Sequence, residues 1–385
     1  MFSLENFYYI LYTNLLQPAR IAAYYFLPFG STDSQNLVTA PGGSSTKDNA
    51  LFWDQEPLIK KTFSKMHTFQ FSSTKHFKLL ANSEHSPLKK ELCRSESYTD
   101  WYYFYHGFAA LDWYRDYQYL PKVENQFTKV FINLNRLVTK DRSYRLLLVS
   151  KMLEQDLVKH GLVSLSLDDH GQGTWQDEIN DPDSKLPRDQ IGIINDRMGK
   201  LTGSLVVDYE HPRGSLSADA GPNELKLNQS ALWHVVSETV FYYDKLHLTE
   251  KIFKPIVSRR PFILVGATGN LAYLKSYGFK TFDRWIDESY DAEPDPTRRI
   301  EMIVTELEKL CNLSMQGLKQ MHEEMQEILD HNFNHLYTDF KSKIVDELVD
   351  NFENAIHIWN HGRFGDKTKD ISQIDLAQVK RLLKS

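Results

Sequence analysis

The chain is poor in cysteine and has no long apolar run. Cys93 and Cys311 are the only cysteines in 385 residues, so neither a disulfide framework nor a cysteine-based metal cluster is expected, and a reducing compartment is indicated. No run approaches the roughly 18 apolar residues that a membrane-spanning helix needs. The N-terminus lacks a basic start and a small-residue cleavage site, so we expect a cytoplasmic protein without signal peptide or membrane insertion.

An excess of basic charge is also missing. The formal net charge is -6 at pH 7, which argues against a protein that binds nucleic acid through bulk charge. The length suggests roughly two to three domains. Aromatic residues crowd into positions 101–105, where a packed junction between a strand and a helix is favoured over a stacking platform for a sugar ring or nucleobase.

Strand-like and helical segments alternate along the chain, which predicts parallel sheets with right-handed crossovers. Residues 129–135 predict a buried strand, 143–160 an amphipathic helix closed by Gly161, and 231–241 and 261–267 two further strands. We therefore predict an α/β fold with two Rossmann-like domains facing a cleft. The expected parts are an N-terminal α/β domain (1–123), a C-terminal domain (124–345) with a polar insertion or lid (168–230), and a helical tail (346–385).

Thr249, Glu250 and Lys251 stand between two of these predicted strands. Thr249 is a suitable N-cap, which places an acid and a base in the first turn of a helix. A carboxylate accepts two hydrogen bonds from a ribose diol, and an ammonium at a helix start binds diphosphate. The triplet by itself is more typical of a routine cap followed by solvated charges.

The wider pattern resembles a known family. Glu238 on a strand, followed by Leu248-Thr249-Glu250-Lys251 and another strand, is similar to the donor-binding core of α1,3-fucosyltransferases. The resemblance implies a GT-B fold, with Glu250 on the ribose and Lys251 on the diphosphate. Residues 248–291 also resemble glycosyltransferase-like proteins of phages and large viruses. Two departures are a Ser-Glu-Thr triplet where the family has Phe-Glu-Asn, and the insertion at 168–230.

A second match follows the strand at 129–135, where fucosyltransferases carry an asparagine and then a basic residue that reaches the pyrophosphate. Asn135 matches the asparagine, and Arg145 is the first choice for the base, with Arg136 and Arg142 as competitors. A guanidinium suits a diphosphate because it can donate two parallel hydrogen bonds. The alternative is that each arginine is a solvated residue at a helix start.

An inverting transferase needs a general base in the first domain. Glu56 is the first candidate and Glu84 the second, because both follow strand-like runs; His106 is the third, because Gly107 would let the backbone approach a ligand. A buried core histidine is the alternative for His106. The acidic segments at 166–171 and 181–183 are interpreted as exposed loop, so no metal or other cofactor is expected.

These observations predict a glycosyltransferase that moves a sugar from a GDP- or UDP-type nucleotide sugar to a glycan hydroxyl, with inversion and without metal. One alternative is a viral enzyme of the host cytoplasm that glycosylates a hydroxymethylated pyrimidine flipped out of DNA. Another is a protein that binds nucleotide sugars without catalysis.

Overall fold

The computed structural model describes residues 2–19, 21–26, 37–39, 49–54, 77–95, 98–120, 127–169, 173–207, 222–361 and 373–385. The chain divides into two compact units. The first unit contains Met1–Arg115 and Tyr337–Ser385, and the second contains Asp116–Leu336. Each unit has a largely parallel sheet with helices, so the predicted α/β class is confirmed. The segment expected as a separate tail belongs to the first unit.

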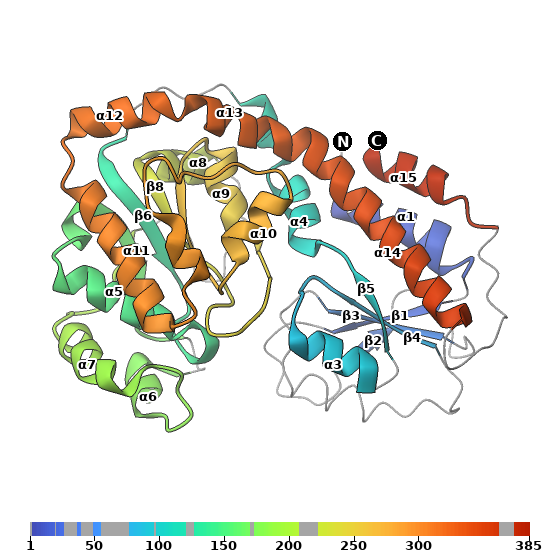
Figure 1. Ribbon diagram of the computed structural model, residues 1–385, viewed down its shortest axis with the longest axis horizontal. Helices are drawn as coiled ribbons and strands as arrows, with labels where there is room; N and C mark the ends of the chain where they lie inside the picture. Colours follow the sequence, from blue (N-terminus) through green and yellow to red (C-terminus); the bar gives the residue numbers. More distant parts are fainter. Residues whose placement is uncertain are drawn as a thin grey trace. The chain divides into compact units, whose positions relative to one another are not determined.

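The first unit is built on a five-stranded sheet in the order β2-β1-β3-β4-β5 (Figure 1). β1, β3, β4 and β5 are parallel, and β2 is an antiparallel edge strand. The strands are β1 (Ile21–Phe26), β2 (Leu37–Thr39), β3 (Asn49–Asp54), β4 (Phe77–Asn82) and β5 (Tyr98–Tyr102). The helices are α1 (Leu4–Leu11), η1 (Tyr12–Leu16), α3 (Pro87–Ser95), α4 (Tyr105–Trp113), η8 (Leu336–Phe340), α14 (Lys341–His361) and α15 (Leu376–Lys384). The short helix η2 (Arg115–Tyr119) begins at the last residue of Met1–Arg115 and continues into the second unit.

The C-terminal helix α14 packs against β5 and helps to build the core of the first unit (Figure 1). Trp101 is fully buried, donates from its indole nitrogen to the Leu348 carbonyl at 3.0 Å, and lies against the ring of Phe352. All five aromatic residues at 101–105 are buried, as the packed-junction interpretation expects. Indole burial with its N–H satisfied is a strong source of packing energy.

The second unit contains a fully parallel sheet in the order β7-β6-β8-β9. Its strands are β6 (Lys129–Asn135), β7 (Gly161–Leu165), β8 (Ala231–Ser237) and β9 (Phe262–Val265). Every residue of β8 and β9 is buried, which explains their continuous apolar runs, since parallel strands are covered on both faces. The helices are η3 (Lys140–Arg142), α5 (Tyr144–Glu154), η4 (Val158–His160), α6 (Trp175–Asn180), η5 (Arg188–Gln190), α7 (Ile191–Gly199), α8 (Pro222–Gln229), η6 (Glu250–Ile252), α9 (Phe253–Val257), α10 (Asn270–Ser276), η7 (Glu288–Ala292), α11 (Pro296–Cys311), α12 (Met315–Glu324) and α13 (Gln326–His335).

One sequence expectation about this unit is wrong. Helix α5 ends at Glu154 rather than running to Gly161, and Gly161 instead opens β7. A Cβ at Gly161 would collide with the ring of Phe131, so close packing on β6 requires the glycine. The described residues of the expected insertion at 168–230 include α6, α7 and α8.

Across the described ranges, no helix combines the length and the apolar character needed to cross a membrane.

Candidate functional site

The strand order of the second unit indicates where a ligand would bind, namely at the carboxyl ends of its parallel strands. β7 lies on one side of β6 and β8 on the other, so the chain reverses direction across the sheet between β6 and β8. In open parallel sheets, ligands bind outside the carboxyl ends of the strands at this reversal. Asn135 ends β6 and Glu238 directly follows β8, so two predicted site residues lie at these carboxyl ends.

The buried carboxylate of Glu238 gathers the polar groups that follow β8. It accepts hydrogen bonds from the Thr249 hydroxyl at 2.5 Å, from the Thr249 amide at 3.2 Å and from the Thr239 amide at 3.3 Å. Thr249 is the N-cap of η6, as predicted, and its hydroxyl accepts from the Lys251 amide at 3.4 Å. The acid of the strand and the cap of the next helix therefore form one cluster.

Glu250 and Lys251 directly follow Thr249 and belong to η6. The Lys251 ammonium is 2.9 Å from a Glu250 carboxylate oxygen and 3.3 Å from the Thr249 hydroxyl. Its side chain is 29 % exposed, whereas that of Glu250 is only 5 % exposed. A ligand can therefore reach the cation, while the acid beside it is held in place.

Burial controls the electrostatics of Glu238. Desolvation raises the pKa of this carboxyl, and the Lys251 ammonium together with the hydrogen bond from Thr249 acts in the opposite direction. The desolvation effect is the largest, because a fully buried carboxylate loses its hydration.

Arg145 has a different environment from the one expected. Arg145 is 3 % exposed, and its guanidinium donates to the carbonyls of Leu137 at 2.9 Å, Ser237 at 3.1 Å and Glu238 at 3.3 Å. The Tyr144 hydroxyl donates to the same Glu238 carbonyl at 2.5 Å. The side chain therefore ties the loop after β6 to the end of β8, and its terminal nitrogens are already used by backbone oxygens.

Asn135, Arg136 and Arg142 are the other residues matched to the fucosyltransferase pattern after β6, and they differ in burial. Asn135 is buried and donates to the Asn133 side chain at 2.5 Å and to the Ser164 carbonyl at 3.2 Å, across to β7. Arg136 is exposed directly after β6, and Arg142 is half-buried at the end of η3. Of the three arginines, these two are the more accessible to an anion.

A buried acid in the insertion fixes that loop. Asp169 is 1 % exposed, and its carboxylate accepts from the Val138 amide at 3.0 Å and from the amide and hydroxyl of Thr139 at 2.9 and 2.8 Å. Glu178, at the end of α6, accepts from the Lys140 amide at 2.7 Å. The interpretation of 166–171 as exposed loop is therefore wrong for Asp169. Its neighbour Asp168 is exposed, so composition alone could not separate the two.

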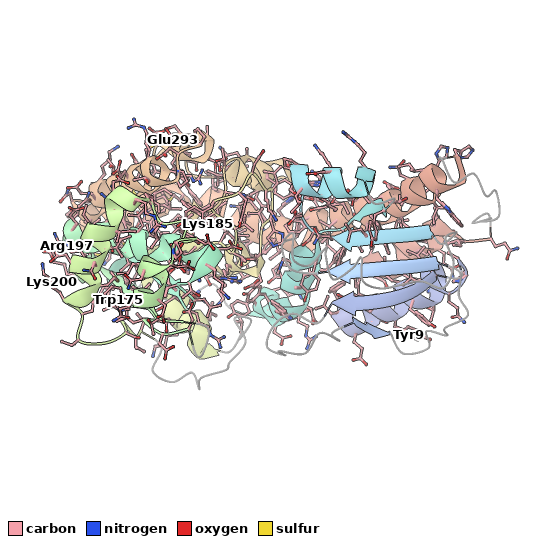
Figure 2. All side chains as sticks on the ribbon, turned by 90° about the horizontal axis from the view of Figure 1, so that it is seen from below. Tyr9, Trp175, Lys185, Arg197, Lys200 and Glu293 are labelled. Atoms are coloured by element: carbon pink, nitrogen blue, oxygen red, sulfur yellow. The ribbon has the colours of Figure 1, made fainter. Side chains whose placement is uncertain are left out.

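A third contact joins the insertion to the loop after β8. The Lys185 ammonium lies 2.6 Å from an Asp141 carboxylate oxygen and 3.5 Å from the centre of the Tyr243 ring. The Tyr243 hydroxyl donates to the same oxygen at 2.9 Å. Lys185 lies in the segment between β7 and β8, as does Trp175, and both side chains are labelled in Figure 2. The sequence did not predict the contact between Lys185, Asp141 and Tyr243, because each of these residues taken alone is typical of a protein surface.

The base candidates belong to the first unit. Glu84 follows β4, is fully buried, and accepts from the Ser86 hydroxyl at 2.5 Å. His106 is buried in α4 beside Tyr105. A Cβ at Gly107 would lie 2.9 Å from the ring of Phe340, so this glycine serves helix packing, and the expected role in ligand approach is not needed to explain it.

The first-choice base, Glu56, lies outside the described residues. Within the described ranges, no three His, Cys, Asp or Glu side chains gather as a metal site would require. Comparisons with family models, curated proteins and solved structures give no match to this chain.

Proposed function

We propose that this protein is a glycosyltransferase that binds a nucleoside-diphosphate sugar of the GDP or UDP type and transfers the sugar, with inversion, to a hydroxyl of a glycan. The observation that carries the proposal is the pairing of Glu250 with a partly exposed Lys251 on the buried Glu238–Thr249 cluster, at the reversal point of a parallel sheet. The proposal includes a GT-B arrangement of the two units.

The chemistry of the cluster suits a nucleoside diphosphate. Glu250 would accept the two ribose hydroxyls, and the Lys251 ammonium would exchange part of its contact with Glu250 for the diphosphate. Arg136 and Arg142 would add positive charge from the loop after β6. The Asp169 and Glu178 bonds support that loop, which keeps its geometry defined before a ligand arrives.

The reaction would need one proton transfer. The acceptor oxygen attacks the anomeric carbon while the bond from that carbon to the diphosphate breaks, and a base takes the proton of the hydroxyl. The leaving diphosphate is an anion, which Lys251 would stabilise. Glu84, His106 and Glu56 of the first unit are the candidates for the base.

Ligand-dependent stability tests the donor site directly. Thermal unfolding of the full chain is measured with GDP, UDP, CMP, dTDP or ADP, for the wild type and for Lys251→Ala. A bound nucleotide at a hundredfold excess over its dissociation constant stabilises the fold by about 2.7 kcal/mol. Lys254→Ala is the matched control, because Lys254 follows one turn later and is also partly exposed.

The expected result is a shift with one nucleotide class that Lys251→Ala loses and Lys254→Ala keeps. A GDP shift would point to fucosyl-like donors. An equal shift in all three proteins would remove the assignment of Lys251, and no shift with any nucleotide would refute the proposed donor site. Release of the nucleoside diphosphate in the presence of oligosaccharide or modified-DNA acceptors then separates transfer from binding alone.

A further inference from the structure

Two exposed histidines stand one turn apart at the end of α14. The rings of His357 and His361 stack with their centres 4.3 Å apart and an interplanar angle of 21°. Nδ1 of His361 lies 3.0 Å from the His357 carbonyl oxygen. A carbonyl oxygen only accepts, so Nδ1 carries the proton and the lone pair of a neutral ring is on Nε2.

A second histidine pair with the same spacing serves a different purpose. On α13, Nε2 of His331 donates to the Gly278 carbonyl at 3.0 Å and Nε2 of His335 donates to the Tyr277 carbonyl at 2.8 Å. These bonds tie α13 to the end of α10, which explains the pair structurally. For the α14 pair, the only ring hydrogen bond among the described residues stays within α14 itself.

We infer that His357 and His361 form a binding site for a divalent transition-metal ion. Residues four apart lie on the same helix face, so both rings can turn one nitrogen toward a shared ion. The Nδ1–carbonyl bond of His361 is the arrangement by which protein ligands orient a metal-binding imidazole. The ion would also lie next to the C-terminal end of α14, where the helix dipole favours a cation.

The ligand set defines the class of ion. Imidazole nitrogen suits Cu²⁺, Ni²⁺ and Zn²⁺, whereas Mg²⁺ and Ca²⁺ prefer oxygen. Among the described residues, no third His, Cys, Asp or Glu completes a cluster with this pair. The site is independent of the proposed donor site, because α14 belongs to the first unit and the Thr249–Lys251 segment to the second.

Calorimetric titration of the untagged full chain with Cu²⁺, Ni²⁺, Zn²⁺ or Mg²⁺ tests the inference. The variants are His357→Ala and His361→Ala, with His331→Ala as the matched control that breaks the other pair. Both α14 rings are exposed, so thermal unfolding without metal should be the same in these two variants and the wild type.

We expect the wild type and His331→Ala to bind Cu²⁺ and Ni²⁺ at this site, Cu²⁺ more tightly, and neither to bind Mg²⁺. Each α14 substitution should weaken Ni²⁺ binding by about tenfold or more, since second-shell changes alone already cost 10–100-fold. Unchanged affinity in His357→Ala and His361→Ala would overturn the inference, as would the absence of Cu²⁺ and Ni²⁺ binding by the wild type.

Discussion

Replacement of Asp169 by alanine should destabilise the second unit far more than the same change at Asp168. The Asp169 carboxylate is the acceptor for three donors, the amides of Val138 and Thr139 and the Thr139 hydroxyl, at 2.8 to 3.0 Å. All of these groups are buried, and the alanine variant offers them no acceptor.

The size of the effect follows from the cost of buried donors without partners. Each such donor costs about 1–3 kcal/mol, so three would cost roughly 3–9 kcal/mol if nothing moved. Relaxation of the loop and entry of water should reduce the loss to about 3–5 kcal/mol. Asp169→Asn keeps one carbonyl oxygen but turns an amide toward a donor, so it should cost about 1–3 kcal/mol.

Urea unfolding followed by circular dichroism measures these differences as shifts of the midpoint at constant slope. Asp168→Ala is the control and should change stability by no more than about 1 kcal/mol, because the contacts of an exposed carboxylate contribute little. The reasoning is refuted if Asp169→Ala is as stable as the wild type, or if the two alanine variants lose the same stability.

Two further predictions concern buried charged or titratable groups. Arg145→Ala should lower stability without any ligand by about 2–4 kcal/mol, since it removes the Arg145 donors from the Leu137 and Ser237 carbonyls, while the Glu238 carbonyl keeps the Tyr144 hydroxyl; unchanged stability in urea unfolding would instead favour a role limited to ligand binding. Burial lowers the pKa of His234 from its unfolded value of about 6.5 to about 3 in the folded protein. The stability that the neutral, buried ring contributes is therefore fully present above about pH 6.5 and is lost as the pH falls toward 3. His234→Gln should therefore flatten the decrease in stability between pH 6.5 and 5 by up to about 1.4 kcal/mol per pH unit, and equal slopes in the two proteins would contradict this.

Local sequence patterns were sufficient to predict three strands of the second unit and the N-cap of η6. The apolar runs at 129–135, 231–237 and 262–265 form the expected parallel strands, because burial on both faces leaves a continuous signal in the sequence. Thr249 caps η6 through a residue only two positions away. Such short-range contacts are encoded in neighbouring residues, so composition and spacing reveal them.

Contacts between distant residues could not be predicted in this way. Asp169 contacts a loop 30 positions earlier, and Arg145 bonds to carbonyls more than 90 positions later. Gly161 follows an amphipathic segment and looks like a helix end, yet the ring of Phe131 on the neighbouring strand decides its role.

The sequence by itself determined the α/β class, the parallel strands and the Thr249–Lys251 segment beside them, because each depends on periodicity or on residues a few positions apart. Only the tertiary structure decided that Asp169 is buried while Asp168 is exposed, and that α14 joins β5 through Trp101 and Leu348. These features depend on which distant segments pack together in the folded chain. Residue type and spacing do not reveal which distant segments will meet.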